Sequence, residues 1–161
     1  MRTLSVGLSL LGALALQSAL GRILPTHGRV FDPFLIVVVF WALRRGEEHG
    51  MFVGLAAGWI QDALFGGVVA GFGALAKLLV GFVTGVAGSR LFIAGPGGRT
   101  LLLLAAAFGD VLLHQWLESL FEVRSTSLSA LGMLARTTLT AAVGAFLLEV
   151  AERRFPPEIR S

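Results

Sequence analysis

Long apolar runs separated by short polar segments fill most of this 161-residue chain. Six such runs can be read, at about 4–20, 33–43, 51–65, 72–88, 100–121 and 128–150. Because a helix needs about 20 apolar residues to cross a bilayer, the pattern predicts an all-α integral membrane protein. We expect about six transmembrane helices in a compact bundle. A single transmembrane domain would cover 1–161, with a short cytoplasmic tail over about 151–161.

The first two runs need separate interpretation. The first is interpreted as an uncleaved span rather than a signal peptide, because its apolar stretch is long and further membrane segments follow it. The second begins with Asp32 and Pro33, which suit an N-cap and a first helical position. It is too short to cross a bilayer unless Val30 and Phe31 join it or the membrane thins locally.

The composition supports the membrane assignment and narrows the possible chemistry. The chain is 55% hydrophobic and 14% charged, whereas soluble domains carry roughly 25% charged residues. It contains no cysteine, so disulfides and thiol nucleophiles are excluded. Neither an HExxH sequence nor a nucleophile elbow is present. We therefore predict that the protein is not an enzyme and needs no cofactor, no metal and no nucleic-acid partner.

The basic residues predict the orientation in the membrane. With the N-terminus inside, eight arginines lie on the cytoplasmic side and three on the opposite side. Because Lys and Arg accumulate in cytoplasmic loops, both termini are expected in the cytoplasm. The eight are Arg2, Arg44, Arg45, Arg90, Arg99, Arg153, Arg154 and Arg160, and the three are Arg22, Arg29 and Arg124.

The stretch RRGEEHG (44–50) is expected to form a solvated cytoplasmic turn. Its arginines, Arg44 and Arg45, are interpreted as a topology signal. The alternative is a contact surface for a cytoplasmic partner or for anionic lipid headgroups.

Glycines recur at intervals that suit close helix packing. Gly50, Gly54 and Gly58 are four residues apart, and Gly81 and Gly85 repeat the spacing. In a membrane helix this clears one face for another backbone, within the chain or in a partner. GFGALA (71–76) matches a dinucleotide-binding fingerprint only formally, because no strand precedes it. The stretch 65–73 is expected to form a tight turn, or alternatively a re-entrant dip.

Two opposite charges lie in the glycine-rich middle of the chain. Asp62 lies near the outer end of the third predicted span, and Lys77 lies about two turns inside the fourth. These helices are expected to be antiparallel neighbours, so the two residues fall at similar depths. Because an isolated charge in lipid costs several kcal/mol, we predict an Asp62–Lys77 ion pair that fastens the helix hairpin.

A second polar group lies in the last two spans. Asp110, His114 and Glu118 are spaced at i, i+4 and i+8, which places them on one helix face. Arg136 in the sixth span falls near the same depth as His114 and is the expected counter-charge. Such a stripe must face protein or water. It is either a structural polar seam between helices or a functional site, namely a proton relay, an ion path or a divalent metal site.

The three tryptophans of the chain also lie in or beside predicted spans. Trp41, Trp59 and Trp116 could anchor the protein at the membrane interfaces. Trp59 and Trp116 lie deeper than an interfacial belt requires, which favours a packing role for these two.

Several features follow one another in order over residues 32–85. A polar residue and a proline open a short apolar helix that ends in A-L-R-R-G. A G-x-x-x-G helix then ends in an aspartate and a glycine turn, and an aliphatic helix containing L-V-G-F follows. This order resembles the rod shape-determining protein MreD family. The resemblance lies in Arg44, Arg45, Gly46, Gly54, Gly58, Asp62, Gly66, Gly71, Gly81 and Gly85. The first span and the part after about Gly95 match only in hydropathy and length.

The resemblance implies a function and a set of partners. It implies a non-enzymatic scaffold of the cell-elongation machinery in the bacterial inner membrane. The implied partners are MreC, RodA with its transpeptidase, and MreB, which act together in lateral peptidoglycan synthesis. It also implies a fold similar to the S components of energy-coupling-factor vitamin transporters.

That fold similarity supplies an alternative function. A vitamin-transporter subunit would bind a small solute in an outward-facing cavity lined by six ionisable side chains. These are Asp62, Lys77, Asp110, His114, Glu118 and Arg136. A third possibility is a proton-coupled enzyme or channel.

Overall fold

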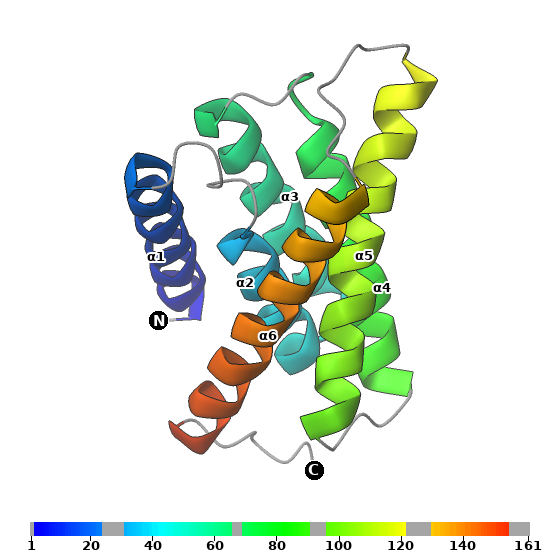
Figure 1. Ribbon diagram of the computed structural model, residues 1–161. Coiled ribbons are helices and arrows are strands. Elements are labelled where there is room, and N and C mark those ends of the chain that lie inside the picture. The colour runs from blue at the N-terminus through cyan, green and yellow to red at the C-terminus, as the bar shows by residue number, and fades with distance from the viewer. Residues whose placement is uncertain (1, 24–30, 66–68, 91–95, 122–129, 155–161) are drawn as a thin grey trace.

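The computed structural model describes residues 2–23, 31–65, 69–90, 96–121 and 130–154, which form six α-helices (Figure 1). The predicted all-α architecture is therefore confirmed. The helices are α1 (Arg2–Ile23), α2 (Pro33–Arg45), α3 (Glu47–Phe65), α4 (Phe72–Arg90), α5 (Pro96–Leu120) and α6 (Ala130–Arg154).

Four of the six helices are long and apolar enough to cross a membrane. Their candidate spans are Leu4–Ile23, Phe72–Arg90, Gly97–Leu120 and Gly132–Val150. The chain is thus a multi-pass membrane protein. α2 has 13 residues and is about 20 Å long, whereas the hydrocarbon core of a bilayer is about 30 Å thick. It occupies only part of the membrane depth.

α2 is the central helix of the bundle. Within the described part of the chain it contacts every one of the other five helices. Its residues Phe34, Val38 and Trp41 pack in one apolar cluster with α1 and α3. Leu35 and Val39, on its other side, pack in a second cluster with α4, α5 and α6. A short helix can therefore organise the bundle because nearly its whole circumference is buried.

Both ends of α2 follow from local sequence. As predicted, Asp32 is the N-cap and its Oδ1 accepts a hydrogen bond of 3.2 Å from the Leu35 amide, while Pro33 begins the helix. At the other end, Gly46 adopts φ 87°, a left-handed conformation that glycine tolerates.

The segment RRGEEHG is not the turn that we expected. Gly46 alone separates Arg45, the last residue of α2, from Glu47, the first residue of α3. His49 and Gly50 consequently belong to α3. The acidic pair Glu47 and Glu48 explains the early start, because carboxylates in a first turn complement the positive end of the helix dipole. α5 likewise begins early, at Pro96, so that Gly97 and Gly98 belong to its first turn.

The glycines of α3 and α4 face each other inside the chain. An added Cβ at Gly54 would meet the carbonyl oxygen of Lys77, and one at Gly58 would meet that of Gly73. Gly50 and Gly81 oppose each other in the same way. The two antiparallel helices therefore touch backbone to backbone along this row. The fifth predicted glycine extends the contact, since a Cβ at Gly85 would meet the backbone of Glu47.

The tryptophans divide into one buried and two exposed side chains. Trp41 is 6% exposed, and its indole N–H donates to Ser9 Oγ on α1 at 3.0 Å. Trp59 and Trp116 are 67% and 61% exposed. The packing role predicted for these two is therefore wrong within this chain, because their rings point away from the bundle.

Candidate functional site: a buried charge quartet

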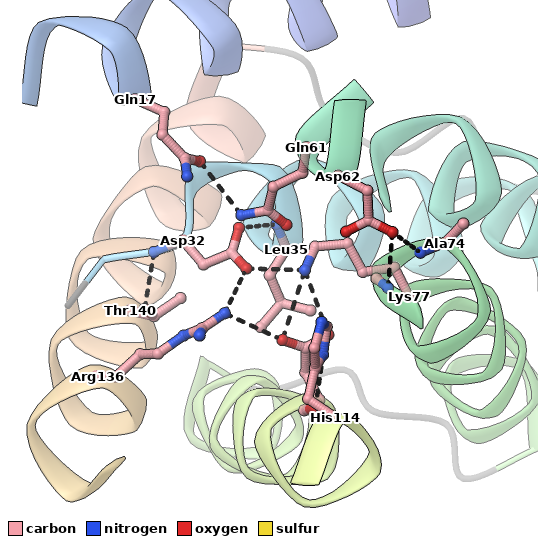
Figure 2. A network of polar contacts seen from close by, with 12 residues as sticks. Gln17, Asp32, Leu35, Gln61, Asp62, Ala74, Lys77, His114, Arg136 and Thr140 are labelled. Atoms are coloured by element: carbon pink, nitrogen blue, oxygen red, sulfur yellow. Dashed lines mark hydrogen bonds and ion pairs between the residues drawn. The ribbon is translucent and has the colours of Figure 1, made fainter. Parts of the chain in front are cut away.

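Four ionisable side chains from four helices meet in the centre of the bundle (Figure 2). Lys77 Nζ on α4 lies 2.8 Å from Asp32 Oδ2 at the start of α2 and 3.3 Å from Asp110 Oδ1 on α5. Arg136 Nη2 on α6 lies 3.0 Å from Asp32 Oδ2 and 3.3 Å from Asp110 Oδ2. Each cation thus contacts both carboxylates. We call these four residues the charge quartet.

The charge quartet is almost completely enclosed by protein. The side chains of Lys77, Asp32 and Asp110 are 0%, 1% and 1% exposed, and that of Arg136 is 18% exposed. Two positive and two negative groups give a formal charge of zero. Because burying an uncompensated charge is costly, this balance and the four short contacts make the burial tolerable.

Local features of the chain place Asp32 and Lys77 in the quartet. Asp32 lies in the centre of the bundle because it is the N-cap of α2, and α2 begins in the centre of the bundle. Its amide also donates to Thr140 Oγ1 on α6 at 3.2 Å, which ties the start of α2 to α6. Lys77 points inward from the part of α4 that touches Gly54. The quartet therefore depends on the glycine contact between α3 and α4 as well as on its own ion pairs.

Asp62 lies outside the quartet, contrary to the predicted Asp62–Lys77 pair. Its Oδ2 accepts hydrogen bonds from the amides of Gly71 and Gly73, each at 2.9 Å, and from that of Ala74 at 3.4 Å. The first amides of a helix lack partners within the helix, and Asp62 supplies one for the start of α4. Lys77 reaches Asp32 and Asp110 instead. Asp62 therefore does join α3 to α4, but it does so by capping α4 and not by an ion pair with Lys77.

Comparison with protein families identifies the kind of protein to which this bundle belongs. The family model described as rod shape-determining protein MreD matches residues 1–150. The chain is a member of the MreD family. The match extends the similarity through α1, α5 and most of α6, beyond the middle third that first suggested it. Neither a curated protein nor a solved structure matches the chain, and the likeness to S components stays a prediction.

The predicted polar stripe on α5 is divided by the structure. Asp110 belongs to the charge quartet, whereas His114 is 28% exposed and its Nδ1 lies 3.3 Å from the Asp110 carbonyl oxygen. Glu118 is partly buried one turn further along. Arg136 contacts the carboxylate of Asp110, in agreement with its predicted role as counter-charge, and it also contacts Asp32.

Sequence reasoning missed Asp32 as a member of the site. The sequence indicated that Asp32 is an N-cap. It did not indicate that the second oxygen of the same carboxylate binds cations. A charge count identifies it only after the structure has shown where Asp62 lies. Once Asp62 is assigned to the cap of α4, Lys77 and Arg136 need two carboxylates at their depth, and Asp110 supplies one. Asp32, which directly precedes α2, can supply the second.

The contacts of the charge quartet are those of a structural junction between helices. Among the described residues, no three His, Asp or Glu side chains lie close enough together to hold a metal ion. Both quartet carboxylates are occupied by two cations each. Of the six side chains expected to line a solute cavity, Asp62, Lys77, Asp110 and Arg136 make their hydrogen bonds within the protein.

Proposed function

We propose that this chain is a non-enzymatic scaffold of the bacterial cell-elongation machinery, and that it binds MreC in the inner membrane. The observation on which this rests is the match of residues 1–150 to the MreD family, whose members determine rod shape. In this role the protein links MreC to RodA with its transpeptidase and to MreB during lateral peptidoglycan synthesis.

The geometry supports a scaffold through its rigidity. The charge quartet joins α2, α4, α5 and α6, and the glycine contact joins α3 to α4. Ion pairs and backbone contacts of this kind fix the register between helices. Outside this core, large apolar side chains cover the surface of every long helix, including Leu8, Phe52, Phe82, Phe108 and Phe146. Such a surface suits lipid and the membrane helices of partners.

The proposed mechanism is association, and its test is recovery of a partner. A tagged form of the chain, expressed with MreC from the same bacterium, is expected to retain MreC through affinity purification in a mild detergent. The control is an unrelated single-span protein of the same orientation and expression level. Recovery of MreC no greater than that of the control would contradict the scaffold function. So would a vitamin found bound to the purified chain by mass spectrometry, because it would favour the solute-binding alternative.

A further inference from the structure

The side of α3 that faces away from α4 presents one continuous stripe. Glu48, Phe52, Leu55 and Trp59 are spaced at i, i+4, i+7 and i+11, which places them on one helix face. All four are exposed, and Phe52 and Trp59 are 74% and 67% exposed. We call these four residues the α3 outer face.

Trp59 is a poor fit to a lipid environment at its position. It lies 12 residues after the start of α3 and six before its end, so it is about 18 Å and 9 Å from the two ends. Within the described part of the chain its indole N–H has no acceptor, whereas that of Trp41 binds Ser9. Lipid tails offer no acceptor either. A neighbouring protein helix would supply one through a side-chain oxygen.

The shape of the α3 outer face suits a single helix. Ala56 and Ala63 are also exposed and lie beside Phe52 and Trp59 on this side of α3. Small residues let a second backbone approach between the aromatic rings. The opposite side of α3 is fixed against the backbone of α4 by Gly50, Gly54 and Gly58. The stripe is therefore held rigid before a partner arrives, which lowers the entropy lost on binding.

The charge at the end of the stripe selects the kind of partner. Glu48 is an exposed carboxylate at the end of the bundle where α2 and α4 end in the arginines Arg45 and Arg90. In the proposed orientation this is the cytoplasmic end. A single-span protein with a cytoplasmic N-terminus tends to carry Lys or Arg just before its span. Running parallel to α3, it would place those cations level with Glu48.

We infer that the α3 outer face is the docking surface for one membrane-spanning helix, which enters from the cytoplasm and carries Lys or Arg next to its span. The inference rests on the proposed function, in which MreC is the partner. It adds the helix face on which that partner binds and the acidic residue that orients it.

Crosslinking tests the surface directly because the chain contains no cysteine. Single cysteines at Phe52, Leu55 and Trp59 are expected to form disulfides with cysteines placed along the MreC span in native membranes. Matched positions on α5 are Phe108, Leu112 and Trp116, which are 51%, 47% and 61% exposed, and these are expected to stay uncrosslinked. Crosslinks from α5 and none from α3 would overturn the inference while leaving MreC binding intact.

Recovery of MreC provides a second, independent readout. Phe52→Ala combined with Trp59→Ala is expected to lower recovery about tenfold, because exposed aromatic anchors dominate interface energies. Phe108→Ala with Trp116→Ala is expected to change it less than about twofold. Glu48→Lys is expected to lower recovery, and exchange of the MreC juxtamembrane cations for Glu to restore it. Unchanged recovery in all α3 variants contradicts the docking surface, whereas no recovery with the unaltered chain contradicts the proposed function itself.

Discussion

Asp32 shows how much one side chain determines at the centre of this protein. Its Oδ1 caps α2 through the Leu35 amide, and its Oδ2 binds both Lys77 and Arg136. Its own amide donates to Thr140. One residue therefore fixes where a helix begins and how three other helices meet it. Asp110 holds the two cations less closely, because its contacts with Lys77 and Arg136 are the longer ones, at 3.3 Å each.

The balance of charge in the quartet predicts a non-additive pair of substitutions. Arg136→Ala is expected to lower the free energy of unfolding by about 3–5 kcal/mol, because it leaves a net negative charge in the core. Adding Asp110→Asn is expected to recover about 1–3 kcal/mol of this loss. Asp110 is preferred to Asp32 for this cycle because it caps no helix. The free energies can be measured by SDS titration of the protein in mixed micelles.

The control for this cycle is Arg90→Ala, which removes an exposed arginine at the end of α4. Its effect on the free energy of unfolding is expected to stay below about 0.5 kcal/mol. Strictly additive losses for Arg136→Ala and Asp110→Asn would show that the two side chains do not interact.

The cap formed by Asp62 gives a second prediction at the scale of a residue. Asp62→Ala leaves the first amides of α4 without their acceptor and is expected to cost about 0.5–2 kcal/mol of stability. Asp62→Asn keeps an acceptor oxygen and is expected to cost less. The same micelle titration measures both. An equal loss in the two variants would mean that the negative charge, rather than the hydrogen bonds, stabilises this end of α4.

At the scale of the helix, the α3–α4 contact is the feature that the spacing of glycines predicted best. The sequence showed that Gly50, Gly54, Gly58, Gly81 and Gly85 clear a face, and the structure shows that these faces meet each other. Spacing alone could not decide whether the surface served this chain or a partner. That choice depends on which helices are neighbours. The short connection between α3 and α4 favours packing of these two helices against each other.

This contact predicts a strong effect of Gly54→Leu. The new side chain would collide with the Lys77 carbonyl and displace the backbone that aims Lys77 into the quartet, so a loss of about 3 kcal/mol is expected. Gly12→Leu on α1 is the matched control, because a Cβ added there meets nothing within 4 Å. Comparable losses in both variants would refute the backbone contact. Loss of a partner in Gly54→Leu would report disruption of the bundle rather than a missing partner contact.

At the scale of the whole molecule, orientation is the open prediction. Ser89 and Ser119 are exposed near opposite ends of the bundle, on α4 and α5. In the cysteine-free chain, Ser119→Cys is expected to react with a membrane-impermeant maleimide in intact spheroplasts. Ser89→Cys is expected to react only after permeabilisation. The reverse pattern would invert the proposed topology and place the N-terminus outside.

The sequence was most informative about features that are local. Hydropathy gave six helices, and Asp32 with Pro33 gave the start of α2 to the residue. It was least informative about which charges meet, because Asp32 and Arg136 are separated by 104 residues. Two carboxylates, Asp62 and Asp32, were both available to Lys77. The choice between them depended on the unpaired amides at the start of α4, which only the folded hairpin brings within reach of Asp62.

The order in which the quartet residues are synthesised has a consequence for how the protein enters the membrane. Asp32 leaves the ribosome early, yet Arg136 is made more than a hundred residues later, on the last helix. A 13-residue helix with a carboxylate at its tip gains little from entering lipid alone. We therefore expect α2 to remain at the membrane surface or beside the insertion machinery until α4, α5 and α6 arrive. The charge quartet can be completed only after α6 is made, because Arg136 belongs to that helix, and chains truncated before α6 are expected to be degraded.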